Sequence, residues 1–187
     1  KFHLKYSKKI IIGSWFTYQK GWYATDYPEI DITSINQCSK YWRKNSKSAF
    51  VAEHVWEHLD KDEAIKGAKC CYFFLKRNGR LRIAVPDGNH PDPNYIDHVK
   101  PNGVGLGSSD HKLLYTIDNL TQIFRDVGFR VRPLEFWDKR GEFHSIKWNS
   151  KWGKISRSLE NDKRNTKENP FSYTSIIIDC YKGEKIE

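Results

Sequence analysis

Four short apolar segments in this sequence each end directly on a glycine or are followed by an acidic residue. They span residues 9–13, 21–26, 48–53 and 80–86. Continuous apolar runs of this length are typical of strands that are buried on both faces of a sheet. A glycine at a strand end lets the backbone approach a ligand closely, and a carboxylate there can accept hydrogen bonds from ligand hydroxyls. The pattern predicts a parallel sheet with a ligand site along the carboxyl ends of its strands.

Two helices are predicted between the strands. Residues 60–75 open with Asp60 and Glu63 in the spacing of a capping box, carry an apolar stripe on one face, and are followed by Gly79, which we expect to end the helix. Residues 116–127 have a similar stripe. Because strands and helices alternate, we predict an α/β domain in which helices cover both faces of a mostly parallel sheet.

The last two predicted strands, residues 129–136 and 173–181, follow each other without a helix between them. Consecutive strands of this kind pair antiparallel. Pro133 favours a position at the sheet edge for the first strand, and the unbroken apolar run of the second predicts a central position between residues 80–85 and the first strand. We therefore predict an open, mostly parallel seven-stranded sheet with an antiparallel last strand. Residues 30–32 would supply a very short strand.

Two insertions interrupt this pattern, and we treat residues 1–187 as one domain that carries both. Residues 87–115 include Gly103-Val-Gly-Leu-Gly107, which we interpret as a flexible lid hinge because no strand directly precedes it, as a nucleotide loop would require. Residues 137–172 form the second insertion. Loops this long in a compact domain are usually functional, and we expect a substrate to enter between the two.

Charge and composition limit the partners and the compartment. The net charge of +9 leaves a nucleic acid open as a partner, but lysine and arginine are scattered along the chain and we do not favour it. No run approaches the ~20 apolar residues of a membrane span, and the first nine residues lack the apolar core of a signal peptide. Four cysteines, two of them adjacent, make a poor disulfide framework. We therefore expect a cytoplasmic protein without membrane attachment. The sequence does not determine its oligomeric state.

Several segments resemble small class I S-adenosylmethionine-dependent methyltransferases of the type 11 group. They are Ile11-Ile-Gly-Ser14, Gly21-Trp-Tyr-Ala-Thr-Asp26, Ala52-Glu-His-Val-Trp-Glu-His-Leu59, Leu81-Arg-Ile-Ala-Val-Pro-Asp-Gly88 and Asp110-His-Lys-Leu-Leu-Tyr115. The resemblance covers residues 9–181 and implies a Rossmann-like fold with S-adenosylmethionine as cofactor. It implies the following cofactor contacts: Gly13, Ser14 and Trp15 on the methionine part, Asp26 on the ribose, Asp31 near the adenine, and Glu53, His54 and Val55 on the opposite wall.

The sequence departs from the family pattern at two points. Most class I enzymes carry G-x-G in the first loop, whereas Ser14 and Trp15 follow Gly13 here, and the segment between the second and third strands is short. Our first hypothesis is a methyltransferase that acts on an oxygen or nitrogen nucleophile of a small molecule or sugar. A degenerate binding module without turnover, or an RNA-binding or RNA-modifying protein, are the alternatives.

The candidate catalytic residues are His54, His58, Asp87 and His111, because an imidazole can accept a proton near neutral pH. The first two also match, with Glu57, the H-x-x-E-H pattern of inverted zinc peptidases, in which histidines one turn apart share a metal. That pattern needs a third protein ligand. The nearest downstream glutamates, Glu135 and Glu142, lie on a predicted strand and in a loop, so we expect no metal.

Overall fold

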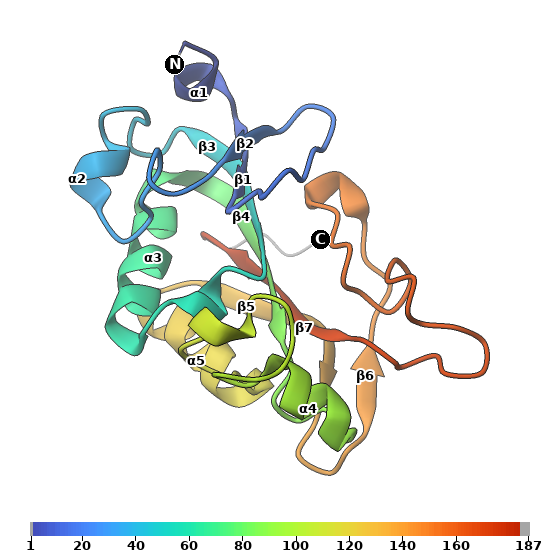
Figure 1. Ribbon diagram of the computed structural model, residues 1–187. Helices are drawn as coiled ribbons and strands as arrows, with labels where there is room; N and C mark the ends of the chain where they lie inside the picture. Colours follow the sequence, from blue (N-terminus) through green and yellow to red (C-terminus); the bar gives the residue numbers. More distant parts are fainter. Residues whose placement is uncertain (1, 184–187) are drawn as a thin grey trace.

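The N-terminal apolar runs form the parallel half of a seven-stranded sheet with the order β2-β1-β3-β4-β7-β5-β6 (Figure 1). The computed structural model describes residues 2–183. Strand β1 (Lys9–Ile12) lies between β2 (Tyr23–Thr25) and β3 (Lys47–Glu53), and β3 pairs with β4 (Leu75–Pro86). All three pairs are parallel, so the strand ends that carry the predicted ligand residues share one edge.

The C-terminal strands complete the sheet as predicted. Strand β7 (Ser175–Tyr181) is fully buried and runs antiparallel to both β4 and β5 (Arg130–Trp137). It therefore occupies the central position that its apolar sequence indicates. Strand β5 is the second to last strand of the sheet, but its first half, which includes Pro133, has β7 on one side and no strand of the described chain on the other, as the edge prediction requires. The strand shifts register against β7 just after this proline, and β6 (Phe143–Ser145) pairs with the second half of β5.

The strand expected at residues 30–32 is not formed. These residues lie in a turn before the short helix α2 (Ile35–Cys38), whose first turn is capped by the Ser34 hydroxyl. Ile30 and Ile32 are nevertheless buried, because their side chains join the main core. The seventh strand of the sheet is instead β6, which the sequence reasoning left inside the second insertion.

The two predicted helices are present with their caps. Helix α3 (Lys61–Phe74) begins with the capping box of Asp60 and Glu63, and α5 (Ile117–Val127) ends at Gly128 in the left-handed conformation. Helix α3 ends five residues before Gly79. The reason is that Leu75 already pairs with Lys47, so strand geometry takes over at that point.

The two faces of the sheet are covered differently (Figure 1). Helices α3 and α5 pack on one face over the larger core. On the other face, Val51, Ala84 and Ile177 pack against Ile155 and Trp148 of the second insertion. The expectation of helices on both faces is therefore wrong, because irregular chain supplies the second layer. The buried guanidinium of Arg82 fastens this layer: it donates to the carboxylate of Asp179 on β7 and to the carbonyls of Asn149 and Gly153.

The remaining elements are short. The described chain also contains α1 (Phe2–Tyr6), α4 (Pro93–Val99), and the 3₁₀ turns η1 (Trp56–His58), η2 (Ser108–Asp110) and η3 (Ser150–Trp152). Among residues 2–183, every helix is too short and too polar to cross a lipid bilayer.

The glycine-rich segment at residues 103–107 is a packed turn rather than a flexible hinge. Gly103 and Gly105 donate their N–H groups to the carbonyls of Lys100 and His98 at the end of α4. A Cβ atom on Gly105 would lie 2.3 Å from the His98 oxygen, so only glycine allows this approach. The segment thus satisfies the carbonyls that the helix end leaves open.

Candidate functional site

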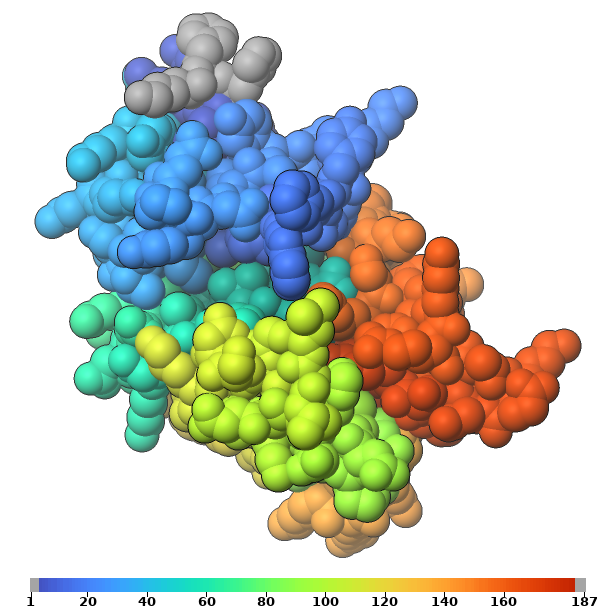
Figure 2. All heavy atoms as spheres, viewed as in Figure 1, coloured from blue at the N-terminus to red at the C-terminus, as the bar shows by residue number. Residues whose placement is uncertain are grey.

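A cleft lies at the carboxyl ends of β1 and β3. It consists of two adjoining cavities of about 390 and 590 Å³, which share five lining residues: Gly13, Trp15, His54, His58 and Asp110. Both volumes lie within the range of about 300–1,000 Å³ that small-molecule sites occupy. In Figure 2 the blue N-terminal part approaches the yellow-green segment of residues 100–111, which we call the lid, on the front face. The teal segment between them is recessed.

The first loop is held in shape by Asp26, which follows β2. The carboxylate of Asp26 accepts hydrogen bonds from the Ser14 hydroxyl (2.5 Å) and from the backbone N–H of Trp15 (3.1 Å). Gly13 has φ +61°, and a Cβ atom there would lie 2.5 Å from Cγ2 of Val55. Trp15 and Phe16 also have positive φ values of 29° and 66°. Strained backbone of this kind clusters at ligand sites.

The larger cavity has an apolar interior with acidic residues beside it. Its apolar lining consists of Ile12, Ile30, Ile32, Val55 and Leu59, and its lining also includes Asp26 and Asp31. One oxygen of Asp31 accepts hydrogen bonds from the N–H and hydroxyl of Thr33. Trp15 borders this cavity with 67% of its surface exposed, so its ring is free to cover a flat ligand. An aromatic base fits between such walls, with the acids toward its sugar.

The smaller cavity is bordered by charged groups from the second insertion. Glu53 accepts the N–H groups of Ser156 (3.0 Å) and Arg157 (2.7 Å), which attaches the insertion to the end of β3. Arg157 and Lys154 line the cavity. The Gln19 amide holds Lys154 through both its carbonyl and its N–H. Sequence reasoning missed Lys154 and Gln19, because only the fold brings residues 19 and 154 together.

Each ring nitrogen of His54 lies close to a protein group, and one of them is within hydrogen-bond distance of a hydroxyl. Its Nε2 lies 3.1 Å from the Ser175 hydroxyl, and its Nδ1 lies 3.1 Å from a carboxylate oxygen of Glu57. Burial holds the pKa of His54 well below its usual range, so the ring is neutral at pH 7. The residue has φ +55° while its N–H donates to the Ala84 carbonyl. His54 therefore shapes the cleft wall and has little freedom to take up a proton from a ligand.

His58 and His111 form a pair beside the cleft. Their ring centroids lie 4.8 Å apart, nearly perpendicular, and both residues line the smaller cavity. Nδ1 of His111 lies 2.7 Å from the Val99 carbonyl, and Nδ1 of His58 lies 3.2 Å from the Asp110 carboxylate. Glu57 next to them is fully buried, and burial raises its pKa to about 7. A ligand in the smaller cavity can therefore contact both imidazoles.

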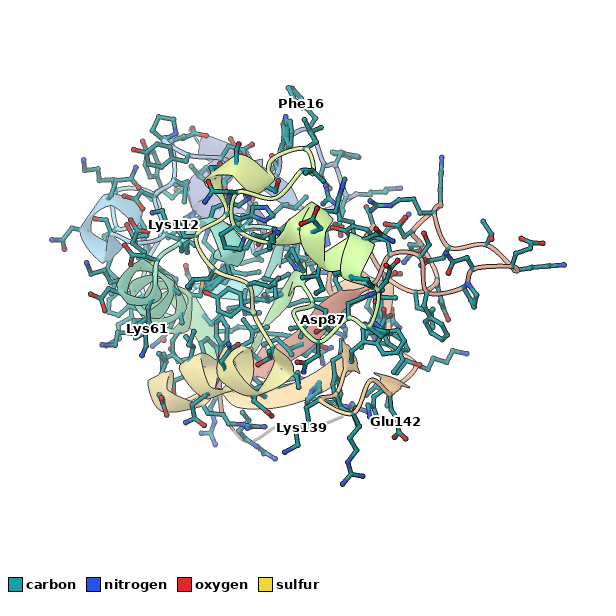
Figure 3. All side chains as sticks on the ribbon, turned by 60° about the horizontal axis from the view of Figure 1, so that its bottom comes forward. Phe16, Lys61, Asp87, Lys112, Lys139 and Glu142 are labelled. Carbon is teal, nitrogen blue, oxygen red and sulfur yellow. The ribbon has the colours of Figure 1, made fainter. Side chains whose placement is uncertain are left out.

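Asp87 lies apart from the other predicted catalytic residues. Its side chain is fully buried in the middle of the molecule (Figure 3), where it accepts the N–H groups of Trp137 (2.7 Å) and Asn89 (2.9 Å). It lines neither cavity of the cleft. Burial raises its pKa to about 6. We therefore assign Asp87 a structural role, joining the end of β4 to the end of β5. The other predicted site residues all border the cleft: Gly13, Ser14, Trp15, Asp26, Asp31, Glu53, His54, Val55, His58 and His111.

Comparison with known proteins identifies the fold. No protein-family model and no curated protein matches the sequence. Solved structures do match. A SAM-dependent methyltransferase from Archaeoglobus fulgidus is 16% identical, with 98% of this chain and 90% of that chain covered and a TM-score of 0.53. A SAM-dependent methyltransferase from Thermotoga maritima is 12% identical, with 94% of this chain and 82% of that chain covered and a TM-score of 0.54. The YcgJ protein from Bacillus subtilis is 11% identical, with 97% of this chain and 94% of that chain covered and a TM-score of 0.51.

These likenesses show that the chain has the class I S-adenosylmethionine-dependent methyltransferase fold, with a mostly parallel seven-stranded sheet and an antiparallel strand β7. The cleft residues fit the cofactor of that fold. Its adenine needs an apolar slot and its ribose an acceptor, which Ile30, Ile32 and Asp26 offer. Its amino-acid tail carries a carboxylate, which the cations of Lys154 and Arg157 can pair with.

Proposed function

We propose that the protein is a methyltransferase that transfers the methyl group of S-adenosylmethionine to an oxygen or nitrogen nucleophile of a small molecule. A sugar is one candidate substrate. The observation that carries the proposal is the cleft itself, in which an apolar slot beside Asp26 adjoins a charged cavity lined by Lys154 and Arg157. The fold supports the same reaction class.

Each cleft residue has a role in this proposal. The first loop around Gly13 and Trp15 holds the methionine part, Asp26 accepts the ribose hydroxyls, and Asp31 borders the adenine. Glu53, His54 and Val55 form the opposite wall. Asp26 retains acceptor capacity for this task, because each carboxylate oxygen offers about two lone-pair positions and each accepts one bond from the loop.

The chemistry needs positioning and one proton acceptor. When bound, the cofactor supplies an activated methyl group on a sulfonium leaving group. The protein aligns the nucleophile with that carbon and removes its proton. His58 and His111 are the groups for this step, since both border the cleft, whereas both ring nitrogens of His54 face protein partners. The substrate enters between the insertions of residues 87–115 and 137–172, past the lid formed by residues 100–111.

Calorimetry with S-adenosylmethionine and S-adenosylhomocysteine tests the proposal. We expect both to bind the wild type, and Asp26→Ala to bind them about 10- to 150-fold more weakly. This corresponds to about 1.5–3 kcal/mol, the usual contribution of a hydrogen bond to a charged group. Asp62→Ala is the matched control, because it removes an exposed carboxylate on α3 outside the cleft.

Equal binding by Asp26→Ala and the wild type, with the fold intact, would remove Asp26 from the site. No binding of either compound by the wild type would refute the proposed function. Binding without methyl transfer to any acceptor in a panel of sugars, amines and phenols would favour the alternative of a binding module without turnover.

A further inference from the structure

Three side chains beside the cleft gather in the manner of a metal site. The ligand atoms of Glu57, His58 and His111 all lie within 4.8 Å of one another. The first two belong to η1 and the third follows η2, at the end of the lid. The backbone fixes this approach, because the N–H groups of Lys112 and Leu113 both donate to the Glu57 carbonyl. From the sequence alone we expect no metal, because neither Glu135 nor Glu142 is a suitable third ligand. The fold brings His111 to that position instead.

The carboxylate of Glu57 is buried without a hydrogen-bond partner in the described part of the chain. It has no exposed surface, and neither of its oxygens accepts a hydrogen bond of good geometry from residues 2–183. The nearest group is Nδ1 of His54, at 3.1 Å from Oε1. A buried carboxylate is costly unless it is paired or coordinates a metal ion. The two flanking imidazoles make coordination the chemistry that suits this one.

Groups outside the cluster lie beside both histidines. The Val99 carbonyl can only accept a proton, so it fixes the hydrogen of His111 on Nδ1 and leaves the lone pair on Nε2. Metal-binding histidines almost always donate their other N–H to a carbonyl or a carboxylate, and His111 already has such a partner in Val99. Asp110 lies 3.2 Å from Nδ1 of His58 without forming a hydrogen bond of good geometry, so it is the nearest group that could take this role for His58.

We propose that Glu57, His58 and His111 bind a divalent first-row transition-metal ion beside the cleft. Two imidazoles and one carboxylate suit such ions better than they suit Mg²⁺ or Ca²⁺, and this ligand set leaves coordination positions open. Metal–ligand distances of about 2.0–2.2 Å allow two ligand atoms at most ~4.4 Å apart. The present spacing, within 4.8 Å, is somewhat above that value, so the three side chains would have to move closer together around the ion.

The open positions face the cleft, because His58 and His111 line it. A hydroxyl oxygen bound there would lose its proton to water more readily, as metal-bound oxygen does in general. With the ion bound, His58 and His111 would act as its ligands instead of accepting that proton themselves. This narrows the nucleophile of the proposed reaction to oxygen. Only that last step rests on the proposed function; the binding of the ion does not.

Direct metal binding tests the proposal. Protein stripped with a chelator and desalted is titrated with Mn²⁺, Zn²⁺ and Mg²⁺, and bound metal is measured by equilibrium dialysis and elemental analysis. We expect one equivalent of Mn²⁺ or Zn²⁺ in the wild type, weaker binding of Mg²⁺, and at least a tenfold loss of affinity in Glu57→Gln and His111→Gln. Added Mn²⁺ should raise the midpoint of thermal unfolding for the wild type and leave that of Glu57→Gln unchanged.

The hairpin between β5 and β6 provides the matched control. Asp138, Glu142 and His144 also lie within coordinating distance of one another, but Glu142 and His144 are exposed. Glu142→Gln and His144→Gln should bind metal as the wild type does. Circular dichroism checks that the Glu57 and His111 variants are folded. If either fails to fold, His58→Gln is used in the same titration, because its side chain is one-third exposed.

Several results would overturn the proposal: no stoichiometric Mn²⁺ or Zn²⁺ in the wild type, tighter binding of Mg²⁺ than of Mn²⁺, or a loss of affinity in the hairpin variants but not in Glu57→Gln. Calorimetry with S-adenosylhomocysteine on the metal-free protein separates this proposal from the proposed function. If the protein binds S-adenosylhomocysteine but no metal ion, only the metal site is refuted. If it binds the metal ion but no cofactor, only the proposed function is refuted.

Discussion

At the scale of single residues, the tightest fit in the cleft is the contact between Gly13 and Val55. We expect Gly13→Ala to lower the free energy of unfolding by about 2–5 kcal/mol. About 1–2 kcal/mol comes from the left-handed backbone, and about 1–3 kcal/mol from the overlap of the new Cβ with Cγ2 of Val55. Urea unfolding measures the change.

A second background isolates the overlap. In Val55→Ala the γ-carbons are absent, so Gly13→Ala should cost only the backbone part there. Gly21→Ala is the control for that part, because Gly21 has φ +80° and no atom within 4 Å of its Cβ position. If the cost of Gly13→Ala is the same in both backgrounds, the close contact does not constrain the first loop.

Asp87 gives a pH-dependent prediction. Its pKa rises from 3.8 in the unfolded chain to about 6 in the fold, so the folded state holds the proton more tightly. Its contribution to stability therefore falls as the pH rises from about 4 to about 6, by about 3 kcal/mol at most. Asp87→Asn does not titrate. The variant should be destabilised by a constant amount, because one hydrogen-bond acceptor is lost. Added to this, its free energy of unfolding relative to wild type should rise between pH 4 and pH 7. A difference that does not change with pH would contradict the burial argument.

At this scale, the sequence predicted the cleft residues that follow a strand directly. It did not predict the surroundings of residues whose neighbours come from distant parts of the chain. Gly13, Asp26 and Glu53 follow the strands that were predicted, so they could be expected in one cleft. Asp87 follows a strand as well, but β5 and β7 enclose it, and no local pattern predicts that enclosure. Glu57 and His111 are 54 residues apart in the sequence, so their approach depends on the path of the lid and could not be predicted from local patterns.

At the scale of elements, the irregular layer over the second face behaves as core. Ile155 of the second insertion has no exposed surface and packs against the β-sheet cluster of Val51, Ala84 and Ile177. We expect Ile155→Ala to cost about 2–5 kcal/mol of unfolding free energy, the range for a buried large-to-small change. Ile146→Ala, at a position 40% exposed, should cost less than about 1 kcal/mol. Equal effects would show that the insertion is only loosely attached.

The helices and most strands could be predicted because their signals are local. The capping box of α3, the glycine after α5 and the apolar run of β7 each determine one element from neighbouring residues. The irregular layer on the second face of the sheet has no such local signal. Trp148 and Ile155 are isolated apolar residues in a polar stretch, so only their tertiary contacts mark them as core. The three-residue strand β6 is likewise determined by its partner β5.

At the scale of the whole molecule, part of the positive charge behind the net value of +9 lies away from the proposed site. One concentration of cations, around a cavity of about 200 Å³, includes Arg80, Lys147 and Lys151 with the aromatic rings of Trp148 and Trp152. It shares no lining residue with the cleft. The cations around this second cavity are therefore not evidence that the cleft takes a nucleic acid.

Salt dependence tests this separation. Binding of a single-stranded RNA should weaken steeply between 50 and 200 mM salt, because phosphate contacts release counterions. The affinity for S-adenosylhomocysteine should change less than twofold over the same range. Fluorescence polarisation and calorimetry give the two values. RNA binding that persists at 200 mM salt and requires Lys154 or Arg157 would instead support the RNA alternative.

The order of strands also affects how the protein behaves at high concentration. Both outer strands of the sheet, β2 and β6, are three residues long, whereas β3, β4 and β7, of seven to twelve residues, lie inside it. Strand β5 has eight residues, and β6 covers its second half only. An outer strand offers unpaired backbone groups to other chains, and short ones offer few. The long apolar backbones of β4 and β7 are each paired on both sides. The fold therefore protects its most aggregation-prone sequence from intermolecular β-pairing for as long as it stays closed.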